Sequence, residues 1–339
     1  MKCKGIVGII GLGLVFLLIF FGSFYLGRYP VNPPDVCRIM ITKIWPGLCE
    51  MTWTPQMEAV VWQVRFPRVL AATAIGAGLA VAGAAYQAIF RNPMVSPEIL
   101  GVSQGAGFGA ALGILMSAGY MMTSLMAFGV GLLAVAISLG VAMISRADKI
   151  LGLVLAGIMV SSIFGSALSL VKLMADPNNE LQVITYWLMG SLASIRMADI
   201  TRALPWIVIG MGLIIAYRWH LGVMMMGEEA SSLGIPVKRI RLQCIFGATL
   251  ISAAAVSISG MIGWIGLVIP HFCRLLLGND YRYVIPGCVL LGASFLLAVD
   301  NIARLLASSE IPIGILTSFV GAPVLLILML RRKGAYADS

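Results

Sequence analysis

Apolar stretches long enough to cross a lipid bilayer recur from one end of the chain to the other. A helix of ~20 residues, rising ~1.5 Å per residue, spans a hydrocarbon core of ~30 Å. The chain is 60% hydrophobic and only 11% charged over 339 residues, which excludes an ordinary soluble domain. We therefore predict an all-α polytopic membrane protein with ten transmembrane helices. The expected spans are 5–26, 69–90, 99–117, 125–144, 150–170, 201–219, 242–259, 262–277, 283–302 and 311–330.

The first of these stretches is interpreted as a span rather than as a cleaved signal peptide. Its apolar run continues from Gly5 to Leu26, whereas the apolar core of a signal peptide covers ~7–15 residues. A further apolar piece, residues 183–195, is too short to cross a membrane. We expect it to form a half-helix that lies at the interface or dips partway into the bilayer.

Proline interrupts several of the expected spans. Pro93 and Pro97 precede the third, Pro270 lies inside the eighth and Pro312 begins the tenth. Broken helices are tolerated at membrane depth only where protein or a water-filled cavity covers the freed backbone groups. The breaks therefore indicate covered or cavity-lining positions.

The distribution of Lys and Arg predicts the orientation. With the N-terminus inside, 14 of the 23 Lys and Arg residues face the cytoplasm and 9 face the other side. Ten spans then place both termini in the cytoplasm, in one transmembrane domain over 1–339 with an extracytoplasmic loop at 27–58 and a cytoplasmic loop at 220–241. The net charge of +9 is scattered between apolar segments, so its partner is expected to be membrane lipid and not nucleic acid.

A charged island interrupts this apolar chain at Gly227–Arg241, with the sequence GEEASSLGIPVKRIR. It contains two adjacent acids, a short helix-forming run, a Gly-Ile-Pro break and then three basic residues. Such a polar segment cannot lie in the bilayer core. The orientation above places it in the cytosol, where a cytosolic protein is its expected target.

A second basic constellation, RFPR at Arg65–Arg68, lies just outside the second span. Pro67 suits the first turn of a helix, but two arginines there oppose the positive end of the helix dipole unless something negative answers them. Arg304 is a third outer arginine, at the end of the ninth span. Either these side chains snorkel to the interface, or they form a docking surface for the carboxylates of an external partner.

Asp300 precedes Arg304 by four residues, a spacing that favours an ion pair on one helix face. A proton-relay role is the less favoured interpretation, because no second acid or histidine lies at helical spacing from Asp300. Both histidines, His220 and His271, are interpreted as packing residues.

The six cysteines form no metal-type cluster. Cys37 and Cys49 share the outer loop, either as a disulfide or as two free thiols. We expect no metal site, no cofactor and no catalytic residues.

Five stretches of the chain, taken in order, resemble the FecCD family of ABC-transporter permeases. Those proteins serve the uptake of ferric siderophores, haem and cobalamin in prokaryotes. The chain departs from the family pattern at Met94 and Trp264, both apolar exchanges, and its outer loop at 27–58 is longer than expected. The stretches that carry the resemblance are Arg65–Gly107, Gly227–Pro236, Ser259–Asp280, Leu296–Arg304 and Glu310–Arg332.

The resemblance implies a type II ABC importer permease fold with ten helices per subunit. Similar permeases form homodimers with a translocation path along the dimer axis. It also implies that Arg65, Arg68 and Arg304 contact glutamates of an extracytoplasmic substrate-binding protein. Short coupling helices would bind two cytosolic ATPase subunits, and the residues here that match that pattern best are Gly227, Glu228, Glu229, Leu233 and Gly234.

We therefore expect a non-catalytic permease subunit in the cytoplasmic (inner) membrane of a prokaryote. It would import an iron complex, a ferric siderophore before haem or cobalamin. The chain has no GxxxxGK[ST] loop, so ATP hydrolysis would belong to its partners. The alternative is a secondary transporter driven by an ion gradient, which requires paired intramembrane acids or histidines.

Overall fold

The computed structural model describes residues 2–47, 50–145, 148–225, 234–307 and 309–337, and within them the chain is helical with no β-strand. The longer helices are α1 (Lys2–Tyr25), α4 (Phe66–Ile89), α6 (Gly119–Ile144), α7 (Lys149–Met174), α9 (Met197–Ala216), α12 (Val237–Ser259), α14 (Tyr281–Leu305) and α15 (Ile313–Ala337). The shorter elements are α2 (Pro33–Ile44), α3 (Pro55–Ala59), the π-helix η1 (Val60–Arg65), the 3₁₀ turn η2 (Pro97–Leu100), α5 (Val102–Leu115), α8 (Glu180–Met189), α10 (Arg218–Met224) and α13 (Ile265–Leu277).

Seven helices in the described part of the chain are long and apolar enough to cross a membrane. They coincide with seven of the ten expected spans. At the other three positions the described apolar helical stretches are shorter, and they are α5, α13 and the part of α15 that covers 313–326. By length, therefore, the structure supports a polytopic membrane protein and does not establish ten spans.

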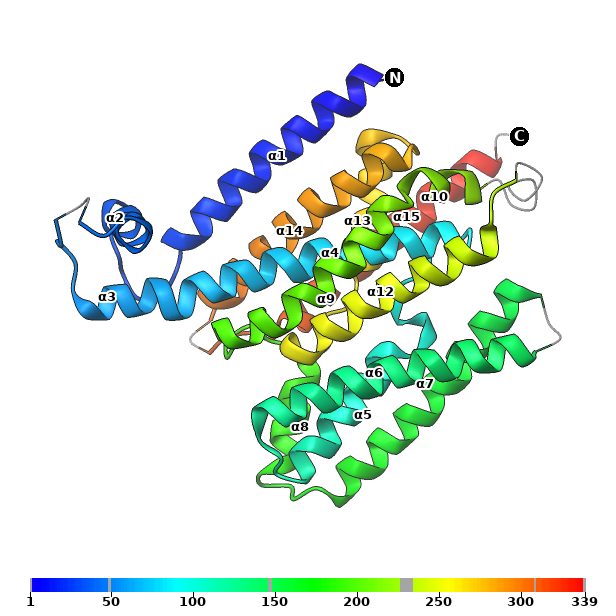
Figure 1. Ribbon diagram of the computed structural model, residues 1–339, viewed down its shortest axis with the longest axis horizontal. Helices are drawn as coiled ribbons and strands as arrows, with labels where there is room; N and C mark the ends of the chain where they lie inside the picture. The colour runs from blue at the N-terminus through cyan, green and yellow to red at the C-terminus, as the bar shows by residue number, and fades with distance from the viewer. Residues whose placement is uncertain (1, 48–49, 146–147, 226–233, 308, 338–339) are drawn as a thin grey trace.

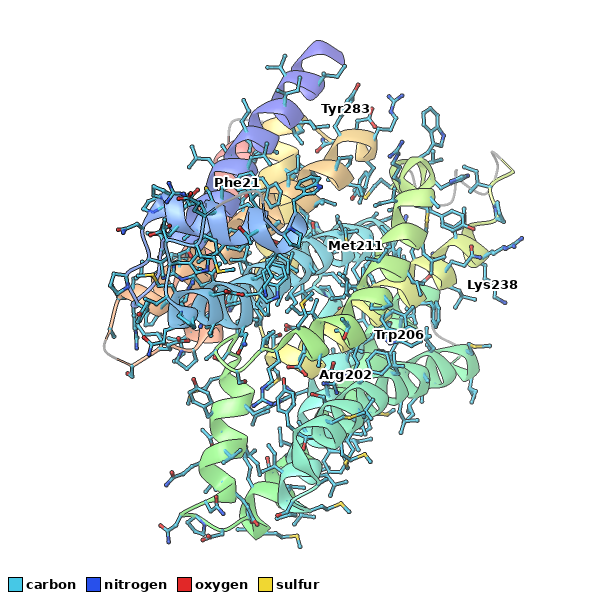
Figure 2. All side chains as sticks on the ribbon, turned by 60° about the vertical axis from the view of Figure 1, so that its left-hand side comes forward. Phe21, Arg202, Trp206, Met211, Lys238 and Tyr283 are labelled. Atoms are coloured by element: carbon cyan, nitrogen blue, oxygen red, sulfur yellow. The ribbon has the colours of Figure 1, made fainter. Side chains whose placement is uncertain are left out.

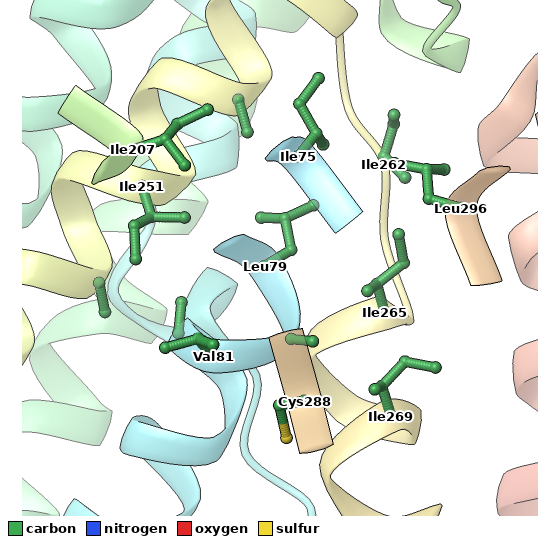
Figure 3. Packing of buried hydrophobic residues seen from close by; sticks show 14 of the residues in the cluster. Ile75, Leu79, Val81, Ile207, Ile251, Ile262, Ile265, Ile269, Cys288 and Leu296 are labelled. Atoms are coloured by element: carbon green, nitrogen blue, oxygen red, sulfur yellow. The ribbon is translucent and has the colours of Figure 1, made fainter. Parts of the chain in front are cut away.

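Helix α4 is the centre of the molecule, packed against α9, α12, α13 and α14 (Figure 1). Its side chains Ile75 and Leu79 lie between two groups of residues. Ile207 of α9 and Ile251 of α12 are on one side, and Ile265 of α13 and Leu296 of α14 are on the other (Figure 3). Small residues allow this close approach. A Cβ placed on Gly76 would lie 2.3 Å from the backbone oxygen of Gly292, so α4 and α14 contact each other through their backbones.

A second group of helices, α5 to α8, packs beside this centre, while α1 lies on the periphery against α14 (Figure 1). Few side chains of α1 are buried, as expected of a helix that faces lipid. The start of α1 and the end of α15 lie at the same end of the molecule, and α2 lies at the opposite end (Figure 1).

The segment 27–58, expected to be an extracytoplasmic loop, contains helical structure. It contains α2, and the helix that continues into α4 begins at Pro55, where Thr54 Oγ1 accepts a hydrogen bond of 3.3 Å from the Met57 backbone N–H. Cys37 in α2 is an exposed free thiol, and Cys49 lies outside the described residues.

Candidate functional site

The RFPR motif lies where a π-helix passes into α4. Arg65 is the last residue of η1, and the Phe66 N–H bonds back to Val61 O, five residues earlier. Pro67 follows immediately and has no N–H to donate. The widened turn before Pro67 sets the direction of both arginines, and single π turns inside α-helices are frequent at functional sites.

Arg65 points into the protein and is only 3% exposed. Its Nη1 donates to Phe24 O at 2.6 Å, and its Nη2 donates to Tyr29 O. These carbonyls lie at and just beyond the end of α1, where helical C=O groups have no intrahelical partner. A Cβ on Gly27 would lie 2.7 Å from the guanidinium, so the glycine leaves the space that Arg65 occupies. Arg65 therefore fastens α1 to α4.

Arg68 and Arg304 share one buried acid. Arg68 Nε lies 2.8 Å from Asp300 Oδ1, and Arg304 Nε lies 3.2 Å from Asp300 Oδ2, at the predicted i, i+4 spacing. Asp300 is fully buried. The opposite side of Arg68 is taken by Glu310, at 2.8 Å from Nη1 to Oε2. Two positive and two negative groups thus neutralise one another, as buried charges require.

Asn301 extends the network by accepting a hydrogen bond from Arg304 Nη2 and donating one of 2.8 Å from Nδ2 to Ser23 Oγ on α1. We call the set Arg65, Arg68, Asp300, Arg304 and Glu310 the outer charge network. It joins α1, α4, α14 and the segment before α15.

The arginines expected either to snorkel to the interface or to form a docking surface are buried and held by the chain's own groups. Within the outer charge network, Glu310 has the most accessible side chain, at 27%. Sequence reasoning predicted the local Asp300–Arg304 pair from its spacing. It missed Glu310 and the inward direction of Arg65 and Arg68, because their partners are far away in the sequence.

The charged island lies mostly outside the described residues, which applies to Gly227, Glu228, Glu229 and Leu233. Gly234 is described and has a φ of +75°, a conformation that favours glycine. Beyond it, Lys238 and Arg239 are exposed at the start of α12, and Lys238 points away from the bundle (Figure 2). Arg202 on α9 lies at the opposite end of the α9–α12 pair (Figure 2).

Three breaks in helical structure meet inside the bundle. They follow α8 at Gly190, follow α12 at Gly260 and precede α15. The Ser191 N–H donates to Ser259 O at 2.8 Å, and the Ile313 N–H donates to Gly190 O at 2.9 Å. These bonds between segments satisfy backbone groups that no helix covers. We call this region the inner junction.

Glycine is required at the inner junction. Gly190 and Gly260 have φ values of +75° and +69°. A Cβ on Gly190 would lie 2.5 Å from Met261 O, and one on Gly260 would lie 2.2 Å from Trp187 O. Both the left-handed conformation and the backbone contact exclude a larger residue.

An open cavity of about 670 Å³ lies against the inner junction. Trp264 has a φ of +71°, a strained value for a residue other than glycine. Its indole N–H donates to Ser318 Oγ at 3.1 Å, and its ring lies where a side chain on Gly321 would be. The lining residues are Leu188, Met189, Met261, Gly263, Trp264, Gly314, Ile315, Ser318, Phe319, Ala322 and Pro323.

This cavity has a wide and mostly apolar wall formed by α8, the residues before α13, and α15. The sequence indicated cavities only in general terms, through prolines and short spans. No periodic pattern marks the lining, because it is assembled from three separate breaks.

Comparison with known proteins places this architecture in a family. A sequence model of the FecCD transport family matches residues 14–331. The molybdate import system permease protein MolB of Haemophilus influenzae is 35% identical over 326 residues, which cover 95% of each chain. The cobalamin import system permease protein BtuC of Halobacterium salinarum is 37% identical over 278 residues, 81% of this chain and 74% of that protein.

Among solved structures, an inward-facing conformation of a putative metal-chelate type ABC transporter superimposes with a TM-score of 0.84. It is 33% identical in sequence, and the match covers 95% of this chain and 98% of that one.

Proposed function

This chain belongs to the FecCD transport family and is a permease of an ABC importer, and on that premise we propose that its cargo is an iron complex, a ferric siderophore foremost. Haem and cobalamin are the neighbouring candidates. The observation that carries the proposal is the cavity of about 670 Å³ at the inner junction. A bulky complex needs a wide and largely inert passage, and the apolar lining of this cavity provides one.

The proposed assembly contains two copies of this chain. The cavity is open at its wall, and a second copy facing it would enclose a path along the dimer axis. Two cytosolic ATP-binding subunits and an extracytoplasmic substrate-binding protein complete the importer. Its location would be the cytoplasmic membrane of a prokaryote with both termini inside, in agreement with their position at one end of the molecule.

Transport would proceed by alternating access. A loaded binding protein docks on the outer face and its cargo enters the cavity between the two copies. ATP binding closes the ATPase subunits, which moves the coupling segment and tilts the helices that line the path. This chain contributes no catalytic group and transmits the motion.

The proposed ATPase contact is Gly227, Glu228, Glu229, Leu233 and Gly234. The exposed Lys238 and Arg239 beside it support a polar protein interface at this end of the molecule. Replacing Glu228 and Glu229 by Lys should release the ATPase subunits from the purified permease. The matched control is Glu50→Lys, an exposed acid near the opposite end. Co-purification of the ATPase with the double variant would refute this contact.

The proposed docking residues for the binding protein are Arg65, Arg68 and Arg304. Because they are buried and paired, reversing their charge would disrupt the fold, so a milder change is needed. Arg304→Lys keeps the charge and loses the planar fork that suits carboxylates. It should lower the ratio of binding-protein-stimulated to basal ATPase activity, whereas Arg202→Lys should not. An unchanged ratio in Arg304→Lys would remove Arg304 from the docking surface.

Uptake into proteoliposomes tests the function as a whole. The permease, its ATPase and its binding protein should accumulate a ⁵⁵Fe-loaded siderophore only when ATP is enclosed, and an ATPase variant unable to hydrolyse ATP should abolish uptake. The alternative of a secondary transporter predicts uptake that follows an ion gradient and is independent of ATP. That outcome would overturn the proposal.

A further inference from the structure

Glu98 lies inside the helix bundle, in the 3₁₀ turn η2 between α4 and α5. The next residues of that turn show its depth. Leu100 O accepts a hydrogen bond of 2.9 Å from Ser138 on α6, and a Cβ on Gly157 of α7 would lie 2.1 Å from Ile99 O. Ser138 is six residues from the end of α6 and Gly157 eight residues into α7, which corresponds to about 9 and 12 Å along these helices.

The Glu98 carboxylate nevertheless has no hydrogen-bond or ion-pair partner among the described residues. The Glu98 side chain is accessible to solvent and does not pack into the hydrophobic core. A Cβ on Gly263 would lie 3.6 Å from Glu98 Oε1, and Gly263 lines the cavity at the inner junction. An ionisable group at this depth is costly unless it faces a water-filled cavity, where it marks a functional position.

The cavity contains no group that would answer this negative charge. Its lining residues include no Lys, Arg or His. The two side-chain donors in the lining are already used, because the Trp264 N–H donates to Ser318 Oγ at 3.1 Å and the Ser318 hydroxyl donates to Gly314 O at 2.7 Å. An oxyanion entering here would lie close to the Glu98 carboxylate and against apolar walls, without a free side-chain donor or a cation in the lining to stabilise it.

We infer that Glu98 places a negative potential over the cavity at the inner junction and thereby selects neutral or cationic metal chelates over oxyanions. This inference rests on the proposed function, since it names the charge class of the cargo. It distinguishes the expected cargo of this chain from the cargo of its relative, the permease named for molybdate import, because molybdate is an oxyanion. An acid placed there for stability alone would have a cationic or hydrogen-bonding partner.

Charge-selective cysteine labelling tests the inference without cargo or ATP. Ala322, an exposed cavity-lining residue, is replaced by Cys in full-length permease from which Cys3, Cys37 and Cys49 have been changed to Ser. The remaining cysteines are buried. The permease, with its ATPase subunits in lipid nanodiscs, is labelled with trimethylammonium-ethyl and sulfonatoethyl methanethiosulfonates, one cationic and one anionic. The rate ratio of the two reagents reports the potential at position 322.

The cationic reagent should react faster at position 322, and Glu98→Gln should lower the cation-to-anion rate ratio on the order of tenfold, the size expected of one unpaired charge beside a partly hydrated cavity. Glu98→Asp should retain the ratio. The control is exposed native Cys37 in a protein without the Ala322 substitution, whose ratio should not respond to Glu98→Gln.

An unchanged ratio at position 322 in Glu98→Gln, or no labelling there by either reagent, would overturn the inference. Neither outcome bears on ATP-driven uptake, because the labelling uses no cargo and no ATP and uptake is measured in a separate experiment. A failure of the proposed function is therefore distinguishable from a failure of this assignment.

Discussion

The acid at the centre of the outer charge network and the acid beside the inner junction have opposite surroundings. In the outer network, Asp300 is completely buried and lies within 3.2 Å of two arginines. Glu98, in η2, lies beside the cavity at the inner junction and has no hydrogen-bond or ion-pair partner among the described residues. Buried charges persist where they are paired, and unpaired ones persist where they face water or cargo. We therefore assign a role in stability to the outer charge network and a role in selectivity to Glu98 and the cavity beside it.

The largest expected effect is the loss of the acid at the centre of the outer network. Asp300→Ala leaves Arg68 and Arg304 buried without their shared partner, which should cost about 3–5 kcal/mol of stability. Thermal unfolding in nanodiscs measures it. The control is Lys43→Gln, which breaks the Lys43–Glu58 pair. That pair is also 2.8 Å long but largely exposed, and is therefore worth less than about 1 kcal/mol. Equal losses in the two variants would show that the network adds no more to stability than an exposed ion pair does.

The next effect belongs to the inner junction. Gly190→Ala forces a side chain into a left-handed conformation and against Met261 O, at 2.5 Å. We expect a loss of about 2–3 kcal/mol, together with altered labelling of a cysteine at position 322. Gly212→Ala in α9 is the matched control. No atom lies within 4 Å of its added Cβ, so a gain of up to about 1 kcal/mol is expected. A Gly190→Ala variant as stable as the parent protein would show that the close contact between Gly190 and Met261 O does not exist.

The smallest expected effect is a pH dependence of folding stability that comes from an exposed ion pair. It gives a reference against which the effects in the two regions can be compared. Hydrogen bonds from Arg282 lower the pKa of Asp280, the N-cap of α14. The charged form therefore stabilises the folded state above the ordinary carboxylate pKa of about 4. This contribution is lost as the pH falls through the lowered pKa. This contribution is small because the pair is exposed.

Asp280→Asn should keep the cap and flatten the acid limb of the stability–pH curve by this small amount. The unfolding midpoint measured between pH 3 and pH 7 reports it. An acid limb identical to that of the parent protein would show that the Asp280 carboxylate does not contribute to the pH dependence of stability.

Local sequence patterns predicted much of this molecule and little of its two sites. Apolar length identified the membrane class, and the i, i+4 spacing identified the Asp300–Arg304 pair, which lies on one helix face. The Arg68–Asp300 contact joins residues 232 positions apart, and no local pattern reports it. The resemblance to a family implied that Arg65, Arg68 and Arg304 contact an external partner, and it did not indicate that tertiary packing buries all three. No sequence pattern indicated a role for Glu98, because only the structure shows that its carboxylate is unpaired.

The most direct test of the comparison is the unfolding midpoint of Glu98→Gln beside that of Asp300→Asn in one nanodisc preparation. Glu98→Gln removes an unpaired charge, so its midpoint should equal or exceed that of the parent protein. Asp300→Asn removes the charge that two buried arginines share, so its midpoint should fall by roughly 5–10 °C. If Glu98→Gln lowers the midpoint as much as Asp300→Asn does, Glu98 is a structural acid and the contrast between the two regions is wrong.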